Sequence, residues 1–276
     1  MKKILAAVDF SESSVNATKY ALLLAKDLAG SSLTLYYTYE IITPGSDGTP
    51  LLVDSEARKA VALTALNNLK AELGDAGNVV VEIVAEAGSF TASLEKYVAH
   101  LGIDLVIMGI TGSTRLEQII IGSNTLNVIN KDICPVLIVP AGVSYRPIKT
   151  AALTTDLKDV ESTTPVKTLA SFLNTFHPEL YVAHVAMEAG AIPESEIIEK
   201  EKLEALLQQY SPRYFYIHEE DFTVAIDKFV EEYHPDIMIT VPREHSFLSR
   251  LFKESYTKKL AYNSNLPILA IHSKHD

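Results

Sequence analysis

Two successive copies of one pattern make up this sequence, and this internal repeat constrains the fold more than any other feature. The aspartates that follow the first apolar strand segment of each copy, Asp9 and Asp156, are 147 residues apart, and Tyr37 and His184 share that offset. Later in each copy the offset falls to 132, as in the pairs Phe90/Phe222, Asp104/Asp236 and Pro135/Pro267. The difference of 15 residues corresponds to a shorter loop after the second strand segment of the second copy, so one duplication explains the whole chain.

Each copy alternates apolar strand segments with helix segments, which is the pattern of a parallel sheet covered by helices on both faces. The first strand, expected over 3–8, is almost wholly apolar, as a strand buried on both faces should be. We predict an α/β protein of two repeated, doubly wound, five-stranded parallel-sheet domains over residues 1–146 and 147–276. Within them we expect a single helix over 160–176 and a glycine-bearing loop directly after a strand over 104–108.

The composition narrows the class of protein further. A formal net charge of −11 gives no electrostatic footprint for nucleic acid and disfavours contact with an anionic membrane. Cys134 is the only cysteine, which excludes an intrachain disulfide and fits a reducing compartment. No apolar stretch reaches the roughly 18 residues of a membrane span, and the apolar run at the start stops at Asp9, too early for a signal peptide. We therefore expect a cytoplasmic protein.

The segment that points to chemistry follows the fourth strand of the first copy. Gly109, Gly112, Gly122 and Ser123 give the spacing G-x2-G-x9-G-S. Glycines let backbone N–H groups approach an anion closely, and Gly122, Ser123 and Asn124 open a helix whose unpaired N–H groups favour negative charge. The pattern predicts a polyphosphate site. The alternative is that these glycines serve only a turn and a helix start.

Asp9 is expected beside this segment. In an open parallel sheet, ligands collect beyond the carboxyl ends of the strands, at the point where the strand order reverses. With the order 3-2-1-4-5, the first and fourth strands are neighbours there, and Asp9 faces the glycines across the crevice. A carboxylate repels a triphosphate unless a cation or a sugar hydroxyl lies between them. We assign Asp9 to the ribose or to Mg²⁺, and the alternative is a carboxylate that stabilises the start of a helix.

The glycine spacing, the strand end VDFS at 8–11 and the segment ICPVLIVP at 133–140 resemble the universal stress protein family in its tandem, two-domain form. The resemblance implies the strand order 3-2-1-4-5 and a bound ATP, with Mg²⁺. It also implies that the two domains pair through their fifth strands, and a further homodimer is left open. The implied phosphate contacts come from Gly109, Gly112, Gly122, Ser123 and Asn124. The implied ribose or base contacts come from Val8, Asp9, Met108 and the backbone at Thr38.

The second copy departs from this pattern. The offset of 132 places Val241, Glu244 and Glu254 where the first copy has its three glycines. Side chains then fill the site and two carboxylates oppose phosphate, so we predict that the second copy binds no nucleotide. Its loop over 243–259 is both apolar and basic, and it either folds over the crevice or forms a surface for a protein or a lipid-like ligand.

These patterns predict an ATP-binding, stress-response regulatory protein with little or no turnover of the nucleotide. No residue is an evident base for activating water, and no other nucleotide-binding or hydrolase motif is present in the sequence. No metal site of protein ligands is expected. Two alternatives stay open: a slow ATPase or nucleotidyl transferase, and a module that binds a protein or lipid-like ligand through the second copy.

Overall fold

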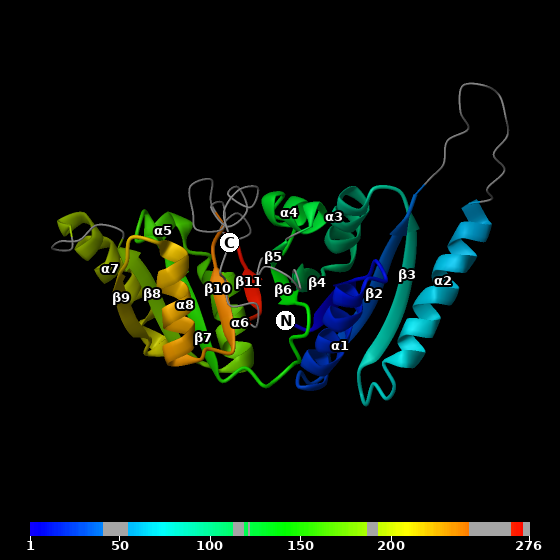
Figure 1. Cartoon of the computed structure of the whole chain (residues 1–276), viewed down its shortest axis with the longest axis horizontal. Coiled ribbons are helices and arrows are strands. Elements are labelled where there is room, and N and C mark those ends of the chain that lie inside the picture. The colour runs from blue at the N-terminus through cyan, green and yellow to red at the C-terminus, as the bar shows by residue number, and fades with distance from the viewer. Residues whose placement is uncertain (41–54, 113–118, 121, 187–192, 243–265, 273–276) are drawn as a thin grey trace, which may run out of the picture.

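The computed structural model describes residues 1–40, 55–112, 119–120, 122–186, 193–242 and 266–272. These residues form one long α/β molecule in which a twisted sheet runs along the longest axis and helices cover it (Figure 1). Among the described helices, none is both long and apolar enough to cross a membrane.

The strands of the first half are parallel and confirm the predicted order. Along the sheet they run β3-β2-β1-β4-β6, which is 3-2-1-4-5 when the short strand β5 is set aside. β5 (Ile119–Ile120) pairs only with the end of β4, in an antiparallel register. The bounds are β1 Lys3–Ala7, β2 Ser32–Tyr39, β3 Val80–Ala87, β4 Leu105–Gly112 and β6 Val136–Pro140.

The second half repeats this order as β9-β8-β7-β10-β11, which confirms the predicted fold class. Equivalent residues make equivalent bonds at the start of each half. The carboxylate of Asp104 accepts hydrogen bonds from two backbone N–H groups at the start of β1, and Asp236 does the same at the start of β7. The bounds are β7 Thr150–Thr155, β8 Glu179–Ala186, β9 Arg213–His218, β10 Ile237–Thr240 and β11 Ile268–Ala270.

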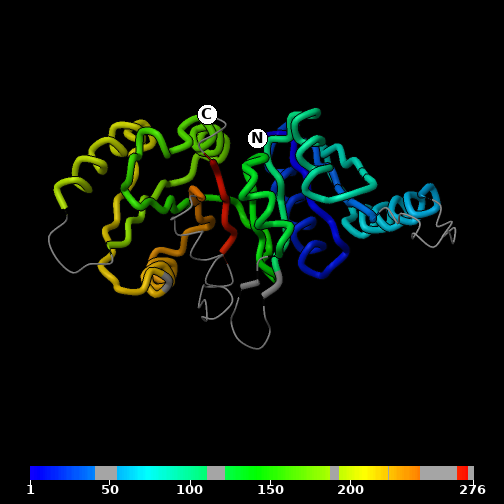
Figure 2. Tube along the Cα trace, turned by 90° about the horizontal axis from the view of Figure 1, so that it is seen from above, coloured from blue at the N-terminus to red at the C-terminus, as the bar shows by residue number. Residues whose placement is uncertain are grey.

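β6 and β11 pair with each other in the middle of the molecule, in an antiparallel register centred on Leu137 and Leu269. The pair joins the two five-stranded sets into one continuous sheet. Figure 2 shows β11, in red, running beside the green strands of the first half, with the two halves on either side. Both strands are fully buried. The pairing therefore covers two apolar edges that would otherwise be exposed.

Successive residues of the strands face two separate helical layers, as the period of a strand requires. Ile4 and Ala6 pack into one core cluster, whereas Leu5 and Ala7 pack into the other. The first cluster lies under α1, α2, α5, α6 and α7, and the second under α3, α4 and α8. The bounds are α1 Glu12–Lys26, α2 Ser55–Glu72, α3 Phe90–Leu101, α4 Ser123–Asn130, α5 Val160–Thr163, α6 Val166–Phe176, α7 Glu194–Leu207 and α8 Phe222–Tyr233, with a 3₁₀ turn at Gln208–Tyr210.

Two expectations about local structure were wrong. The single helix expected over 160–176 is broken into α5 and α6 at Pro165. Thr164 is extended because the proline ring disfavours helical geometry in the residue before it. The loop expected after 104–108 begins later, because β4 continues to Gly112 and Gly109 lies inside the strand, paired with Val139. The alternating pattern of the second copy also predicts a helix over 254–263, and these residues lie outside the described part of the chain.

Candidate functional site

The carboxyl ends of β1 and β4 define the candidate site. β1 lies between β2 and β4, so the chain leaves β1 toward β2 on one side and returns to β4 on the other. This reversal is the place where doubly wound sheets bind ligands. The pairing of β1 with β4 runs through Ala6 and Ile107, which places Val8 and Asp9 alongside the end of β4.

Asp9 lies in a tight turn between β1 and α1. Its Oδ1 accepts hydrogen bonds from the backbone N–H and the hydroxyl of Ser11, at 2.9 and 2.5 Å. Its own N–H donates to Ser14 Oγ at 3.3 Å. Partial burial raises the pKa of the Asp9 carboxyl, but the hydrogen bonds from Ser11 and Ser14 together lower it by more. The net pKa is therefore below the usual 3.8. Asp9 is therefore an exposed, fixed carboxylate at neutral pH.

The turn around Asp9 carries two features that the motif did not predict. Phe10 adopts a left-handed backbone conformation with φ of 63°, which costs a non-glycine residue about 1 kcal/mol or more. Its ring is partly exposed and packs on Tyr37 at a centroid distance of 4.9 Å. In the second half Leu157, at the equivalent position, has φ of 49°. The shared conformation belongs to the repeated fold, and the apolar residue after each strand-end aspartate was its only signal in the sequence.

Gly109 has a structural explanation. A β-carbon added there would lie 2.2 Å from the Ser13 carbonyl oxygen and 2.8 Å from the Ser14 amide nitrogen, both backbone atoms of α1. No side chain fits at this distance. Gly109 therefore allows the first turn of α1 to lie against β4, and this contact brings the Asp9 turn to the point where the strand order reverses.

The residues assigned to the ribose or base line the same edge but differ in access. Val8 and Met108 are buried, so their side chains point into the core clusters. The Val8 N–H donates to the Tyr36 carbonyl oxygen at 2.8 Å, and the ladder between β1 and β2 ends there. Thr38 lies two residues beyond Tyr36 and is half-buried. Its backbone pairs only with β3 among the described strands, so it is placed at the open end of β1.

Gly122 caps the start of α4, as the sequence predicted. It is extended, with φ of −63° and ψ of 151°, and the helix start receives no side-chain hydrogen bond from it. Ser123 and Asn124 follow in the first turn, and all three residues are exposed. Apart from its own chain neighbours, no described residue has a heavy atom within 4 Å of a β-carbon built on Gly122. Gly112 ends β4 and pairs with Ile119. Residues 113–118 and residue 121, which lie between Gly112 and Gly122 in the sequence, are outside the described part of the chain.

The equivalent crevice of the second half is lined by the protein's own carboxylates. Glu199 of α7 accepts a hydrogen bond from the backbone N–H of Val160 at 2.7 Å, at the start of α5. Hydrogen bonds from Lys202 and from Val160 lower the pKa of Glu199, so it is charged at neutral pH. Asp156, the counterpart of Asp9, accepts from the Lys158 N–H. A carboxylate already bonded to a helix start opposes a second anion there.

His184, the counterpart of Tyr37, adds a further contact with α7. Its side chain is 7% exposed. Its Nδ1 lies 3.1 Å from the Thr155 carbonyl oxygen, and its Nε2 lies 3.3 Å from Glu196 Oε2. These contacts hold α7 over the ends of β7 and β8. No motif in the sequence signalled the roles of Glu196 and Glu199. Val241 takes the place of Gly109, and Glu244 and Glu254 lie outside the described residues.

Together, the doubly wound sheet, the strand reversal and the start of α4 define an α/β protein with a candidate ligand site at the strand reversal of its first half. The described residues contain no group of three or more side chains that could hold a metal ion. The chain belongs to the universal stress protein family, whose sequence profile matches residues 1–140.

The chain is similar to the following proteins. Universal stress protein MJ0577 of Methanocaldococcus jannaschii is 32% identical over 153 residues, which cover 50% of this chain and 94% of the relative. A universal stress protein structure from Archaeoglobus fulgidus covers 98% of this chain and 97% of its own, with a TM-score of 0.69 and 17% identity, so it shares the fold of both halves. A universal stress protein solved in complex with cAMP is 21% identical, covers 51% of this chain and 98% of its own, and has a TM-score of 0.36.

Proposed function

We propose that the first half of this chain binds ATP together with Mg²⁺ and that the protein is a cytoplasmic stress-response regulator with little or no turnover of the nucleotide. The observation that carries the proposal is Gly122 at the open start of α4. Its backbone conformation is available to any residue, and no described residue beyond its chain neighbours comes within 4 Å of a β-carbon built on it. Glycine is a common helix cap, but unlike Ser, Thr, Asp or Asn it offers no side-chain acceptor to the first N–H groups of the helix, and a bound phosphate would satisfy those groups.

Gly109 and Gly122 therefore differ in what explains them. Packing against Ser13 requires glycine at 109, whereas nothing in the described fold requires it at 122. A phosphate that contacts the backbone of Gly122, Ser123 and Asn124 would supply the missing reason. Gly109 therefore contributes to the proposed site by letting α1 lie against β4. The phosphate contact assigned to Gly109 from the motif is replaced by this indirect role.

Asp9 supports a nucleotide rather than free phosphate. It is a fixed carboxylate beside the proposed phosphate site, and its Oδ1 is already bonded to Ser11. A carboxylate near a phosphate repels it unless a cation or a neutral donor lies between them. Mg²⁺ on the phosphates or a ribose hydroxyl fills that position, and the backbone at Thr38 then lies on the side of the base.

We further propose that residues 1–146 and 147–276 are two domains that pair through β6 and β11. The segment between β6 and β7 is bonded to both halves. Tyr145 donates a hydrogen bond to Asp27 at 2.6 Å and packs on Tyr20, while Arg146 forms an ion pair with Asp236 at 2.8 Å. Anchoring on both sides supports a boundary within this segment.

Thermal unfolding with and without MgATP tests the ATP site. A ligand that binds only the folded state at a hundredfold excess over Kd stabilises it by about 2.7 kcal/mol. We expect MgATP to raise the Tm of the wild type and to raise it much less for Gly122→Val. Asn127→Val, an exposed position on the same helix, is the matched control and should respond like the wild type. Equal shifts in all three proteins would reject the site.

Phosphate release tests the absence of turnover. We expect the MgATP complex to release phosphate at the background rate, because no described side chain at the site is placed as a base other than the ionised Asp9. Steady release well above background that is lost in Asp9→Ala would instead favour the slow ATPase.

A further inference from the structure

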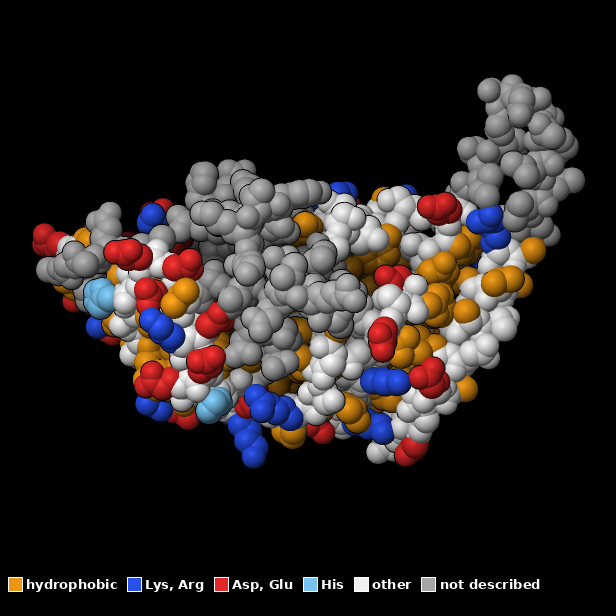
Figure 3. All heavy atoms as spheres, viewed as in Figure 1, with side chains coloured by type: hydrophobic (Ala, Val, Ile, Leu, Met, Phe, Trp, Pro, Cys, Tyr) orange, Lys and Arg blue, Asp and Glu red, His pale blue; other side chains and the backbone are white. Residues whose placement is uncertain are grey.

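A cavity in the first half lies between α1, α2 and β3, and none of its lining residues belongs to the proposed nucleotide site. Its volume is about 350 Å³, within the range of roughly 300–1,000 Å³ that small-molecule sites occupy. It is lined by Leu22, Asn67, Lys70, Ala71, Leu73, Gly74, Ala76 and Val81. Figure 3 shows hydrophobic side chains gathered along the hollow between α1 and α2.

The walls of the cavity are apolar. Leu22 of α1 is buried and contributes to the cavity lining, and Val81 of β3 is half-buried. Leu73 and Ala76 pack on the same core cluster as Leu22 from the turn that joins α2 to β3. These side chains offer carbon surface and no hydrogen-bonding group, so the inner part of the cavity suits a hydrocarbon segment.

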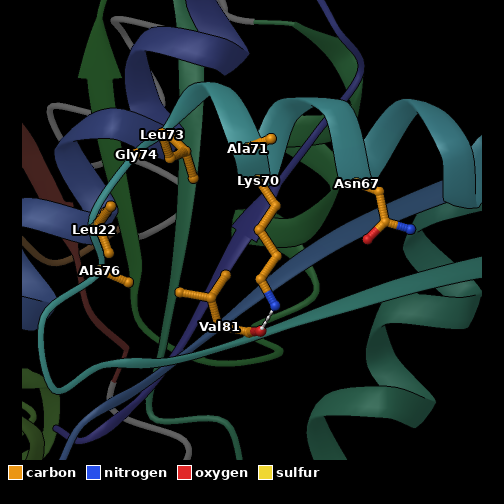
Figure 4. A pocket seen from close by; sticks show the side chains of 8 residues that line it. All are labelled: Leu22, Asn67, Lys70, Ala71, Leu73, Gly74, Ala76 and Val81. Atoms are coloured by element: carbon orange, nitrogen blue, oxygen red, sulfur yellow. Dashed lines mark hydrogen bonds between the residues drawn. The ribbon is translucent and has the colours of Figure 1, made fainter.

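Two polar side chains lie together at one side of the cavity. Asn67 and Lys70 are three residues apart on α2, so they share a helix face, and Figure 4 shows both extending from α2 toward β3. Lys70 Nζ donates to the Val81 carbonyl oxygen at 2.5 Å, and Asn67 Nδ2 donates to Leu63 at 3.0 Å. An ammonium has three donors and an amide nitrogen has two. After these bonds, both groups retain N–H donors for a ligand.

The charges around the cavity indicate a ligand with one negative charge. Lys26 of α1 lies beside the turn, because its Cε is 3.9 Å from a β-carbon built on Gly77. Glu72 and Asp75 also flank the turn, although Glu72 is paired with Lys19 at 3.0 Å. Lys70 can neutralise one carboxylate, whereas the neighbouring acids would oppose a dianion such as a phosphate monoester.

We propose that this cavity binds a single-chain acyl carboxylate, a free fatty acid of short to medium length. Its chain lies against Leu22, Leu73 and Val81, and its carboxylate accepts hydrogen bonds from Lys70 and Asn67. Such charge-assisted bonds are stronger than neutral ones. The site is independent of ATP, since none of its residues belongs to the nucleotide crevice.

The test is isothermal titration of the full chain with decanoate, below the concentration at which it forms micelles. We expect one site in the first half and ¹H–¹⁵N shift changes confined to the lining residues. Lys70→Gln should weaken binding about tenfold or more, the order expected for a lost charged hydrogen bond. Lys70→Arg should retain most of it. Lys59→Gln removes the same charge from an exposed position on α2 and should change nothing.

Ala71→Phe separates cavity filling from charge. Ala71 is exposed on α2, so a larger side chain there should fill the cavity without preventing folding. A rise in Tm with MgATP equal to that of the wild type would show that the variant is folded. We expect this variant to lose decanoate binding. Equal binding by Lys70→Gln and the wild type, equal binding of decyltrimethylammonium, shift changes elsewhere, or no binding of decanoate would overturn the proposal. If decanoate binds as expected but MgATP fails to raise the Tm of the wild type, the result contradicts the proposed nucleotide site and leaves the decanoate site supported.

Discussion

The backbone of Ser13 lies against Gly109 so closely that a β-carbon at position 109 would lie 2.2 Å from the Ser13 carbonyl oxygen. This contact joins the start of α1 to β4 beside the strand reversal. In the second half the same positions are Val160 and Val241, and both carry side chains. The helix start there is the four-residue α5, which Pro165 separates from α6. The first half alone therefore has a long helix starting against its fourth strand.

Gly109→Ala should destabilise the protein, because the clash is with backbone atoms and cannot be relieved by a side-chain rotation. Overpacking of this kind typically costs about 1–3 kcal/mol. Urea denaturation should show a lower midpoint with an unchanged m-value. Gly122→Ala is the matched control, since no described residue beyond its chain neighbours lies within 4 Å of the added carbon. Glycine is a better helix cap than alanine, so the midpoint of this variant should fall, but by less than that of Gly109→Ala. Equal effects of the two substitutions would contradict the close approach at Ser13.

Asp104→Asn and Asp236→Asn should reduce stability by similar amounts. In each of these residues one carboxylate oxygen, Oδ2, accepts two backbone N–H bonds at the start of a strand, at 2.7 to 2.9 Å. A hydrogen bond to a charged acceptor contributes about 1.5–3 kcal/mol to the free energy of unfolding, and the neutral amide of asparagine weakens these bonds. The ion pair of Asp236 with Arg146 is mostly exposed on the arginine side, so it should add little. Denaturation of both variants measures this, and a large effect in one half with none in the other would contradict the structural repeat.

Cys134 should be unreactive in the native protein. It is 5% exposed, and burial raises the pKa of its thiol from 9.0 to about 12. Three pKa units lower the thiolate fraction at neutral pH about a thousandfold, and the thiolate is the nucleophile. Labelling with a thiol reagent should be slow in buffer and fast in urea. Fast labelling of the folded chain would show that the start of β6 is open, contrary to its buried pairing with β11.

Charges in the junction between the halves should loosen the molecule. Val136 and Leu137 are buried in β6 and pair with Ala270 and Leu269 of β11. Replacing both with aspartate leaves buried charges without partners, which is strongly unfavourable. We expect a larger radius in small-angle scattering and faster proteolysis between the halves. Val61→Asp combined with Val80→Asp, at exposed positions, is the control. An unchanged radius and unchanged protease resistance in the junction variant would refute the arrangement.

The sequence predicted much of the fold because its strongest signals are periodic. The offsets of 147 and 132 reappear in the sheet register, where Ile4 pairs with Leu105 and Ala151 pairs with Ile237. Buried strands and amphipathic helices follow from such patterns. The break at Pro165 was also readable from the sequence, since the residue before a proline disfavours helix.

The site was less predictable, because it depends on distances between segments that lie far apart in the sequence. The spacing of glycines does not distinguish Gly109, which packing requires, from Gly122, which packing leaves unexplained. The hydrogen bond from Val160 to Glu199 joins residues 39 positions apart, and neither belongs to a motif. The protein's own carboxylates in the second crevice could only be found once α7 was placed.

The number of ATP molecules bound per chain tests the central claim most directly. The first half has an open helix start at Gly122, whose counterpart Glu254 lies outside the described residues; the second half has Glu199 bonded to the start of α5 and a side chain at Val241. A carboxylate near phosphate and the lost backbone approach should weaken the second site at least about a thousandfold, with tenfold for each 1.4 kcal/mol. Calorimetric titration of the full chain with MgATP should give one site, lost in Gly122→Val. Two equivalent sites, or one site that Gly122→Val leaves unchanged, would contradict this account.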